Sequence, residues 1–363
     1  MVTLHGIKAR LMKIGIVTFT YGDNYGQRLQ NCAVQEILKG YANDVVTIPQ
    51  SKIRNRGIVF FKNIYKYFIN GEMVLSILRH RSFGKFDFQF IKYNRYSVIR
   101  GKLTNEGEFD FFVAGSDQIW SPFSPDVNST MFLTFTDKKK RIALSPSISA
   151  EVIPEEQREK YKKYFEGFSH LSVREDKGAE IIKELTGRDA SVLIDPTLMH
   201  SATFWNKYIK APISFKNGKY ACCYFLGTPQ KAEKIREICK KYGLNRIDIL
   251  GDKKYKVLGP QEFLYLIKNA SVVITDSYHG CIFSCIFHIP FILCEREGTN
   301  INMNSRFSTL FKKLEINNRR LLEIEIEDAL SMDFASIDRR VENERELVKE
   351  YLDNAFKRTS KQE

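Results

Sequence analysis

Short apolar runs alternate with amphipathic stretches along most of the chain. Each run ends in a polar turn, as a buried parallel strand does, and the stretch that follows repeats its apolar positions every three or four residues, as a helix does. The pattern therefore predicts an α/β fold. Strands are expected at residues 14–19, 45–48, 109–114, 140–145, 171–175, 191–194, 220–226, 246–250, 272–274 and 291–294. Helices are expected at residues 28–39, 154–167, 176–185, 229–241, 261–268, 278–289 and 305–314.

This order of elements predicts two Rossmann-like domains that face each other across a cleft, because it contains two successive β-α-β-α series. We place the first domain at residues 12–197 and the second at 198–335. The last segment, 336–363, is expected to contain a charged amphipathic helix at 337–357 that crosses back to the first domain. The length of 363 residues also favours two domains over one.

The stretch 272–289 carries the clearest chemical signal. A buried strand runs through the turn Thr275-Asp276-Ser277 directly into an apolar helix. His279 and Gly280 fall on the first turn of that helix, where unpaired backbone N–H groups and the helix dipole favour an anion. A histidine there can stay neutral near pH 7 and still exchange a proton. The alternative interpretation is that Asp276 or Ser277 caps the helix and His279 is a surface residue.

Composition narrows the class of protein. Hydrophobic residues make up 43% of the chain, yet no apolar run approaches the ~20 residues that cross a bilayer. The N-terminal residues are too few and too polar for a secretory signal. The seven cysteines form no C-x-x-C pair, and most lie in apolar runs, so we interpret them as reduced core residues. Together these features predict a cytoplasmic protein.

The net charge of +13 is concentrated in one segment. Residues 52–102 contain twelve Lys and Arg but only two acidic residues, a balance of +10, and they are interleaved with aromatic residues. Amphipathic helices are expected at 58–69 and 73–78, so the segment is predicted to be a basic helical insertion in the first domain. Its face is either simply solvated, or contacts an anionic membrane at the inner leaflet, or binds nucleic acid. No nucleic-acid-binding motif supports the last alternative, so no nucleic-acid partner is expected.

Polar side chains follow two strands of the first domain. The loop after 14–19 contains Asp23, Asn24 and Gln27 beside two glycines, but it is neither G-x-G-x-x-G nor a P-loop. The strand 109–114 is followed by Gly-Ser and then by Asp117, Gln118 and Trp120, which offer a carboxylate, an amide and an aromatic face to a sugar. In parallel sheets ligands bind at such carboxyl ends. Ordinary turn residues are the alternative.

Several stretches, in order, resemble the polysaccharide pyruvyl transferase family. The matching runs are GDNYGQRLQNCA (22–33), FVAGSDQIW (112–120), LSVRE (171–175), LIDPTLM (193–199) with Trp205, ITDSYHGCIFSCIFHIPFI (274–292) and SRF (305–307). The resemblance implies a GT-B arrangement, with the acceptor on the first domain and the donor on the second. It also implies transfer of pyruvate from phosphoenolpyruvate to two hydroxyls of a sugar, forming a cyclic ketal and releasing phosphate.

By position in these runs, His279 and Arg174 correspond to family residues at the phosphoenolpyruvate site. A further basic residue beyond the histidine helix is expected to be Arg296 or Arg306. Some members carry Arg two residues before the histidine, where this chain has Ser277. The usual small-residue run after the strand 140–145 reads Pro-Ser-Ile-Ser here, a departure expected to affect the choice of acceptor.

The implied reaction needs an acid that protonates the methylene carbon of phosphoenolpyruvate, and we assign this role to His279. Ser277, Gly280, Arg174, Arg296 and Arg306 are expected on the donor.

Asp117 is a second catalytic candidate, and Asp23, Asn24, Gln27, Gln118 and Trp120 are expected on the acceptor, a saccharide that can be lipid-linked. No residues have metal-ligand spacing, and phosphoenolpyruvate is a co-substrate rather than a cofactor.

Other interpretations remain open at this point. Arg174 and Glu175 can form an ordinary salt bridge. The chain can be a GT-B glycosyltransferase that uses a nucleotide sugar. It can also be a non-catalytic protein that binds anionic lipid or nucleic acid through residues 52–102.

Overall fold

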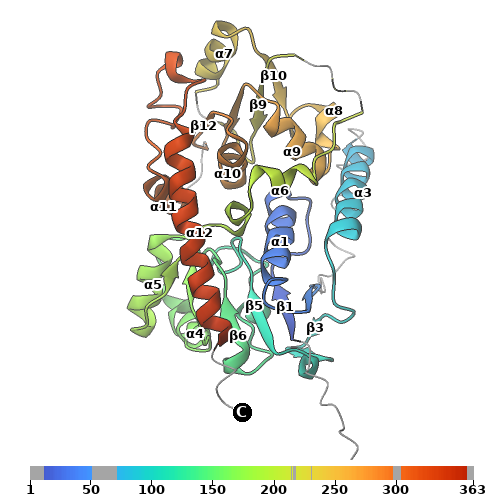
Figure 1. Cartoon of the computed structure of the whole chain (residues 1–363), viewed down its shortest axis with the longest axis vertical. Coiled ribbons are helices and arrows are strands. Elements are labelled where there is room, and N and C mark those ends of the chain that lie inside the picture. Colours follow the sequence, from blue (N-terminus) through green and yellow to red (C-terminus); the bar gives the residue numbers. More distant parts are fainter. Residues whose placement is uncertain are drawn as a thin grey trace, which may run out of the picture.

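The computed structural model describes residues 12–50, 72–213, 215, 218–229, 231–296 and 304–357. Its two main sheets each contain four strands, and all strand pairs within them are parallel. One sheet lies in the lower half of the molecule in Figure 1 and the other in the upper half. The prediction of an α/β fold with two Rossmann-like domains is confirmed.

The first domain contains β1 (Lys13–Val17), α1 (Tyr25–Leu38), β2 (Asp44–Thr47), α3 (Glu72–Phe90), β3 (Val98–Ile99), β4 (Lys102–Leu103), β5 (Phe111–Ala114), β6 (Arg141–Ala143), α4 (Glu155–Phe165), β7 (Ser172–Val173), α5 (Asp176–Thr186) and β8 (Ser191–Val192). The second contains α6 (Ala202–Asn206), β9 (Tyr220–Tyr224), α7 (Ala232–Lys241), β10 (Asn245–Asp248), α8 (Lys253–Lys256), α9 (Pro260–Lys268), β11 (Val272–Thr275), α10 (Tyr278–Phe287), β12 (Phe291–Leu293) and α11 (Asn304–Leu314), and α12 (Phe334–Lys357) follows it. Short 3₁₀ helices include η4 (Pro196–Met199) between the two domains.

Both sheets have the same strand order. The first is β2-β1-β5-β6 and the second is β10-β9-β11-β12, so the chain reverses direction across the sheet between β1 and β5 and again between β9 and β11. Loops diverge at such a switch point and leave room for a ligand at the carboxyl ends of the strands. The loops predicted to carry chemistry, 115–120 and 275–277, follow β5 and β11 at these two points.

α10 is a completely buried helix. All ten of its residues are buried, and it packs against the end of β11. A Cβ atom at Gly280 would lie 2.7 Å from Thr275 Oγ1, so only glycine permits this approach. The helix ends at His288, which has the left-handed φ of 55°. A helix held this way presents its N-terminus in a fixed direction.

The domains are joined by an apolar contact. The ring of Tyr25 on α1 stacks on Phe263 of α9, with centroids 4.4 Å apart, and its hydroxyl donates to the carbonyl of Leu258 at 3.0 Å. One cluster of buried apolar residues extends from the first sheet to the second. An apolar interface of this kind disfavours free relative motion of the domains.

α12 runs along both domains (Figure 1). Near its start Asp338 pairs with His288 of the second domain at 3.0 Å. Near its end the Tyr351 hydroxyl donates to the carbonyl of Ala143 in β6 at 2.6 Å, and the ring of Phe356 packs on Phe111 of β5. This helix therefore contacts both domains.

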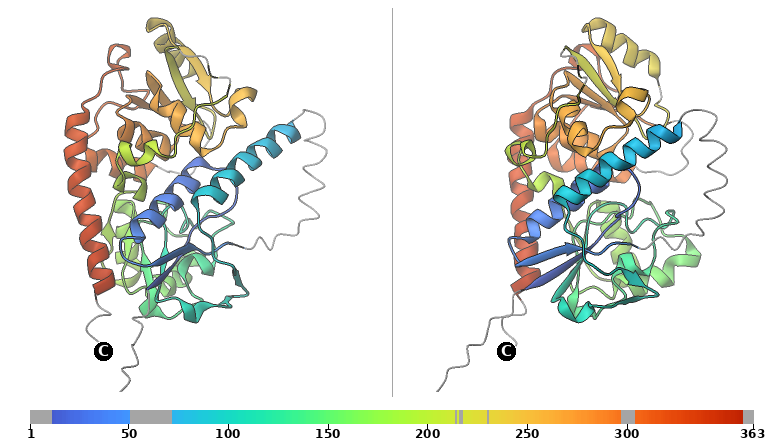
Figure 2. Two further views of the ribbon diagram at one scale, coloured as in Figure 1. Left: turned by 45° about the vertical axis from the view of Figure 1, so that its right-hand side comes forward. Right: turned by 90° about the vertical axis from the view of Figure 1, so that its right-hand side faces the viewer.

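The basic insertion differs from the prediction. The helix predicted at 58–69 lies outside the described residues. The helix predicted at 73–78 extends to Phe90 because Phe83 and Phe86 anchor its second half in the core. α3 lies along the outer edge of the molecule, and Figure 2 shows its whole length. Among the described residues, no helix is long and apolar enough to cross a membrane.

Candidate active site

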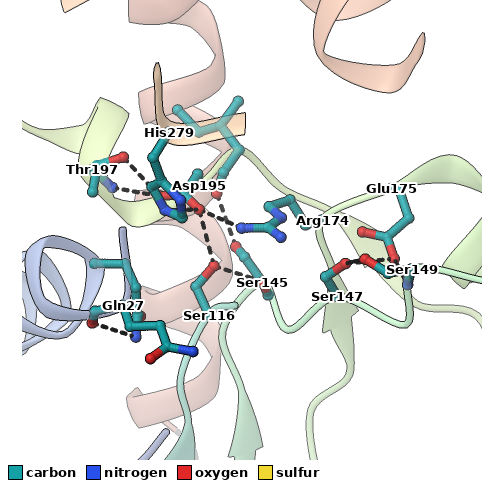
Figure 3. Close-up of polar contacts among 12 residues, drawn as sticks. Gln27, Ser116, Ser145, Ser147, Ser149, Arg174, Glu175, Asp195, Thr197 and His279 are labelled. Carbon is teal, nitrogen blue, oxygen red and sulfur yellow. Dashed lines mark hydrogen bonds and ion pairs between the residues drawn. The ribbon is translucent and has the colours of Figure 1, made fainter. Parts of the chain in front are cut away.

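Side chains that follow four neighbouring strands meet at one buried point. Ser116, Ser145, Arg174 and Asp195 follow β5, β6, β7 and β8 at their carboxyl ends. Asp195 lies at the centre (Figure 3). Its Oδ2 accepts from Arg174 Nη1 at 2.7 Å and from Ser116 Oγ at 3.2 Å, and its Oδ1 accepts from the backbone N–H and the hydroxyl of Thr197.

The environment keeps Asp195 ionised. Burial opposes ionisation of this fully buried carboxyl, but His279, Arg174 and the Thr197 N–H outweigh it and hold its pKa well below the usual value. A buried carboxylate with such partners fixes the groups around it. Asp195 is therefore suited to orient both Arg174 and His279.

His279 reaches the same carboxylate from the second domain. Its Nε2 lies 3.4 Å from Asp195 Oδ2, and this buried nitrogen accepts or donates no hydrogen bond within the part of the chain that the structure describes. The opposite side of the ring faces Gly26 on α1, where a Cβ atom would lie 2.1 Å from His279 Nδ1. His279 is only 7% exposed, so the interpretation of it as a surface residue is wrong.

Arg174 offers unused donors inside the site. Its side chain is fully buried, and Nη1 is bonded to Asp195, whereas Nε and Nη2 have no hydrogen-bond partner among the described residues. The guanidinium lies 4.3 Å from the ring centroid of Tyr278, the residue beside His279. Buried N–H donors left without acceptors are costly in a folded protein. Their presence indicates a place for a ligand with acceptor oxygens.

Glu175 shapes the loop beside Arg174. Its Oε1 accepts from the backbone N–H groups of Ile148 and Ser149 at 2.7 and 2.9 Å and from the Ser147 hydroxyl at 3.0 Å. Glu175 is fully buried, and the described structure contains no hydrogen bond between its carboxylate and Arg174. The interpretation of Arg174 and Glu175 as an ordinary salt bridge therefore fails.

The two further arginines differ in their surroundings. Arg296 Nε donates to Asp276 Oδ2 at 2.6 Å, so its charge is already balanced. Arg306 is buried and lies 5.7 Å from the ring centroid of Tyr278, on which Arg174 also packs. Burial, together with the charges of Arg174 and Arg296, lowers the pKa of Arg306 to about 10. Arg306 therefore lies beside Arg174 on the same ring, which keeps it a candidate for the donor site.

A sequence model of the polysaccharide pyruvyl transferase family matches residues 24–298, which include every residue of this buried centre except Arg306. The chain belongs to this family. The resemblance in the sequence is thereby confirmed. A search among curated proteins finds no match.

Comparison with solved structures identifies the fold of the chain. A putative UDP-N-acetylglucosamine 2-epimerase from Listeria monocytogenes shares 10% identity, with a TM-score of 0.50 over 95% of this chain and 97% of that one. The UDP-GlcNAc 2-epimerase from Neisseria meningitidis, solved with UDP-GlcNAc, also shares 10% identity, with a TM-score of 0.44 over 94% and 99%. Such low identity shows only the fold, which is the GT-B arrangement of two Rossmann-like domains.

A pocket opens beside the buried centre on the first domain. Its volume is about 240 Å³. Gln27 and Gln118, two of the residues predicted to bind the acceptor, line it together with Ser149 of the loop that Glu175 holds. Aromatic side chains of Phe19, Tyr21 and Phe123 form part of its wall. Amides beside aromatic rings suit a sugar.

The Asp117 carboxylate interacts electrostatically with the buried centre. Its carboxylate acts on both Arg174 and Arg306, and the residue is 7% exposed. Its φ of 83° is unusual for a residue other than glycine, and its carbonyl accepts from the Ser147 N–H at 2.8 Å. A strained backbone held in this way is common where a side chain must be aimed precisely.

Three residues predicted to bind the acceptor make contacts within the protein. Trp120 is fully buried and stacks on Phe132, so its ring cannot form a platform for a sugar. Asn24 caps α1 by accepting from the Gln27 N–H at 3.3 Å. Asp23 pairs with His80 on α3 at 3.2 Å rather than lining the pocket. The prediction for Trp120 is therefore wrong, whereas those for Asn24 and Asp23 stay predictions.

The turn before α10 does not form the side-chain cap that the alternative interpretation expected from Asp276 or Ser277. Ser277 occupies the N-cap position, but its side chain makes no capping hydrogen bond. Asp276 instead accepts from the backbone N–H groups of Leu226 and Gly227 at 2.7 and 2.8 Å. The first turn of α10 is therefore not blocked by either side chain.

Six residues of the centre were not predicted from the sequence as site residues: Ser116, Ser145, Glu175, Asp195, Thr197 and Tyr278. Asp195 was interpreted as the first residue of the turn that ends the strand 191–194, because Asp-Pro-Thr is a common turn sequence. The signal that could have revealed it was its position at the carboxyl end of a strand next to that of Arg174.

Proposed function

We propose that this family member transfers pyruvate from phosphoenolpyruvate to two hydroxyls of a sugar in a polysaccharide or its lipid-linked precursor. A cyclic ketal forms and phosphate is released. The observation that carries the proposal is the fully buried Arg174 beside His279, because two of its nitrogens have no hydrogen-bond partner among the described residues. Such a group matches the carboxylate and phosphate oxygens of phosphoenolpyruvate.

The donor would lie between α10 and the arginines. The N-terminus of α10 suits the phosphate, because its N–H groups and dipole favour an anion. Arg174 and Arg306, both packed on Tyr278, suit planar recognition of the remaining oxygens. Asp195 holds Arg174 in place from the side away from these unpaired nitrogens.

His279 would supply the proton. Protonation of the methylene carbon leaves an oxocarbenium-like centre at the adjacent carbon, which one sugar hydroxyl attacks. Phosphate leaves from that carbon, and the second hydroxyl attacks it to close the ring. One of the two hydroxyl protons restores His279 and the other leaves with phosphate, so the reaction balances. A positioned acid of this kind contributes ~10²–10⁴-fold to the rate.

The acceptor would occupy the pocket beside the centre. Gln27 and Gln118 can bind its hydroxyls. The Asp117 carboxylate, whose charge acts on Arg174 and Arg306, can relay a hydroxyl proton to the leaving phosphate. Among the described residues that line the pocket, Asp126 carries a carboxylate and none is basic.

The nucleotide-sugar alternative receives less support. In a Rossmann-like domain a diphosphate binds backbone N–H groups in the turn after the first strand. In the second domain this turn follows β9, and its N–H groups at Leu226 and Gly227 already donate to Asp276. Arg296 also covers Gly227, where a Cβ atom would lie 2.9 Å from Arg296 Cδ.

A thermal-shift experiment tests the proposal. Phosphoenolpyruvate and nucleoside diphosphates are compared on the wild type, on Arg174→Ala, and on Arg236→Ala as a control with an exposed arginine. A ligand at a hundredfold its dissociation constant adds ~2.7 kcal/mol of stability. We expect phosphoenolpyruvate to stabilise the wild type and Arg236→Ala but not Arg174→Ala. Stabilisation by a nucleotide alone would overturn the proposal and favour glycosyl transfer.

A further inference from the structure

α3 exposes an apolar stripe on its outer face. Val74, Ile77, Leu78 and Phe88 are 58, 45, 41 and 93% exposed. Their spacing places all four on one side of the helix, together with the exposed Arg81 and Lys85 between them. We call these six residues the α3 stripe. Single exposed apolar residues are ordinary, but a continuous stripe of this kind marks an interaction surface.

The other face of α3 is firmly attached. Phe83 and Phe86 are buried in the core. The Arg79 guanidinium donates to the carbonyl oxygens of Asp23 and Lys256 and to the Tyr25 hydroxyl, at 2.7 to 2.9 Å. These contacts tie the helix to both domains. The exposure of the stripe therefore belongs to a rigidly held helix.

The charge of the stripe has one sign. The one acidic residue with a described side chain on α3, Asp87, faces inward and pairs with Arg28 at 2.9 Å. Arg81 and Lys85 thus lie among exposed apolar residues without an acidic neighbour on that face of the helix. An anionic partner complements this positively charged surface. The net charge of +13 favours such a partner as well.

We propose that the α3 stripe docks on the surface of an anionic lipid bilayer. The apolar side chains would enter the region between headgroups and acyl chains, and Arg81 and Lys85 would bind lipid phosphates. A second copy of the chain is a poorer occupant. In a two-fold dimer through this stripe, Arg81 and Lys85 would face the same charges on the other copy.

Docking through α3 would also orient the active site. Arg79 and His80 of α3 both contact Asp23, in the loop that leads to Gln27 at the acceptor pocket. A bilayer against α3 would then hold this loop close to the lipid surface, where a lipid-linked acceptor resides. This consequence rests on the proposed function, whereas the docking surface does not.

Vesicle sedimentation tests the docking surface. The full chain is mixed with vesicles of phosphatidylcholine alone or of phosphatidylcholine with phosphatidylglycerol. One variant replaces Val74, Ile77, Leu78 and Phe88 by Ser, and a second is Arg81→Glu with Lys85→Glu. The matched controls replace exposed residues elsewhere: Val152, Leu322 and Leu347 by Ser, and Arg236 with Lys240 by Glu.

We expect the wild type and both controls to bind the anionic vesicles and not the neutral ones. Each stripe variant should bind at least about tenfold more weakly, and added salt should weaken wild-type binding. Equal binding by variants and controls would overturn the proposal. So would a wild-type dimer that the stripe variants convert to a monomer. Vesicle binding without stabilisation by phosphoenolpyruvate would leave the docking surface standing and remove the proposed function.

Discussion

Asp195 and His279 belong to different domains, yet their Oδ2 and Nε2 atoms lie 3.4 Å apart. The same Asp195 oxygen accepts a hydrogen bond from Arg174, so one carboxylate contacts both residues that the family resemblance places at the donor. The centre therefore exists only when the two domains are in contact. The apolar packing of Tyr25 on Phe263 stabilises that contact.

Replacement of Asp195 by Asn should harm both stability and turnover. Asparagine keeps the size of the side chain but removes the carboxylate that is bonded to the buried Arg174, and breaking such a buried pair costs about 3–5 kcal/mol. Denaturant unfolding and kcat measure the two effects. The control is Asp189→Asn, because Asp189 is 90% exposed and its pair with Lys183 contributes about 0–1 kcal/mol. Equal losses in both variants would contradict the role of Asp195.

Replacement of His279 by Ala should abolish turnover and leave the fold intact. Loss of a general acid lowers kcat by ~10²–10⁴-fold, whereas Arg174 and the N-terminus of α10 remain to bind phosphoenolpyruvate. Single-turnover kinetics and ligand-induced thermal shifts separate these effects. Near-normal turnover in this variant would reject His279 as the acid.

Gly26 should tolerate no side chain. In Gly26→Ala the new Cβ atom would lie 2.1 Å from His279 Nδ1, so the ring must move away from Asp195. We expect kcat to fall by at least tenfold, and the free energy of unfolding to fall although alanine favours helices by about 1 kcal/mol. Gly84→Ala in α3 is the matched control, because nothing lies within 4 Å of its Cβ position. It should unfold at an equal or higher temperature and keep full activity.

Mild acid should destabilise the protein through His200. Burial lowers the pKa of His200 from 6.5 to about 4, and its Nε2 lies 3.1 Å from the Ala33 carbonyl. The unfolded chain therefore binds a proton at higher pH than the folded chain does. The contribution is complete above pH 6.5 and is lost as the pH falls towards 4, by up to ~3 kcal/mol.

His200→Gln tests this origin, because glutamine can donate to Ala33 but does not titrate in this range. The free energy of unfolding, measured by urea titration at pH 8 and pH 5, should differ less in the variant than in the wild type. The same difference in both proteins would assign the acid sensitivity to other groups.

The sequence predicts the fold well because the strands are short apolar runs with polar turns at their carboxyl ends. The second half of α3 escaped because apolar residues lie on both of its faces: Phe83 and Phe86 point inward, whereas Phe88 points outward. No helical period remains visible in such a segment.

The site was predicted only in part, for two physical reasons. Contacts between Asp195 and His279 join residues far apart in the sequence, and no local pattern encodes them. Composition also cannot distinguish an aromatic ring that faces a ligand from one that fills the core. Trp120 was misassigned for the second reason, since it stacks on Phe132 out of reach of solvent.

The crossing of α12 has a consequence for biosynthesis. Phe356 and Tyr351 complete the packing of β5 and β6 in the first domain, although the ribosome adds them after both sheets have been made. The nascent first domain therefore exposes an apolar surface while the second domain is being translated. We expect this surface to be a binding site for chaperones, and catalytic competence to appear only after α12 has left the exit tunnel.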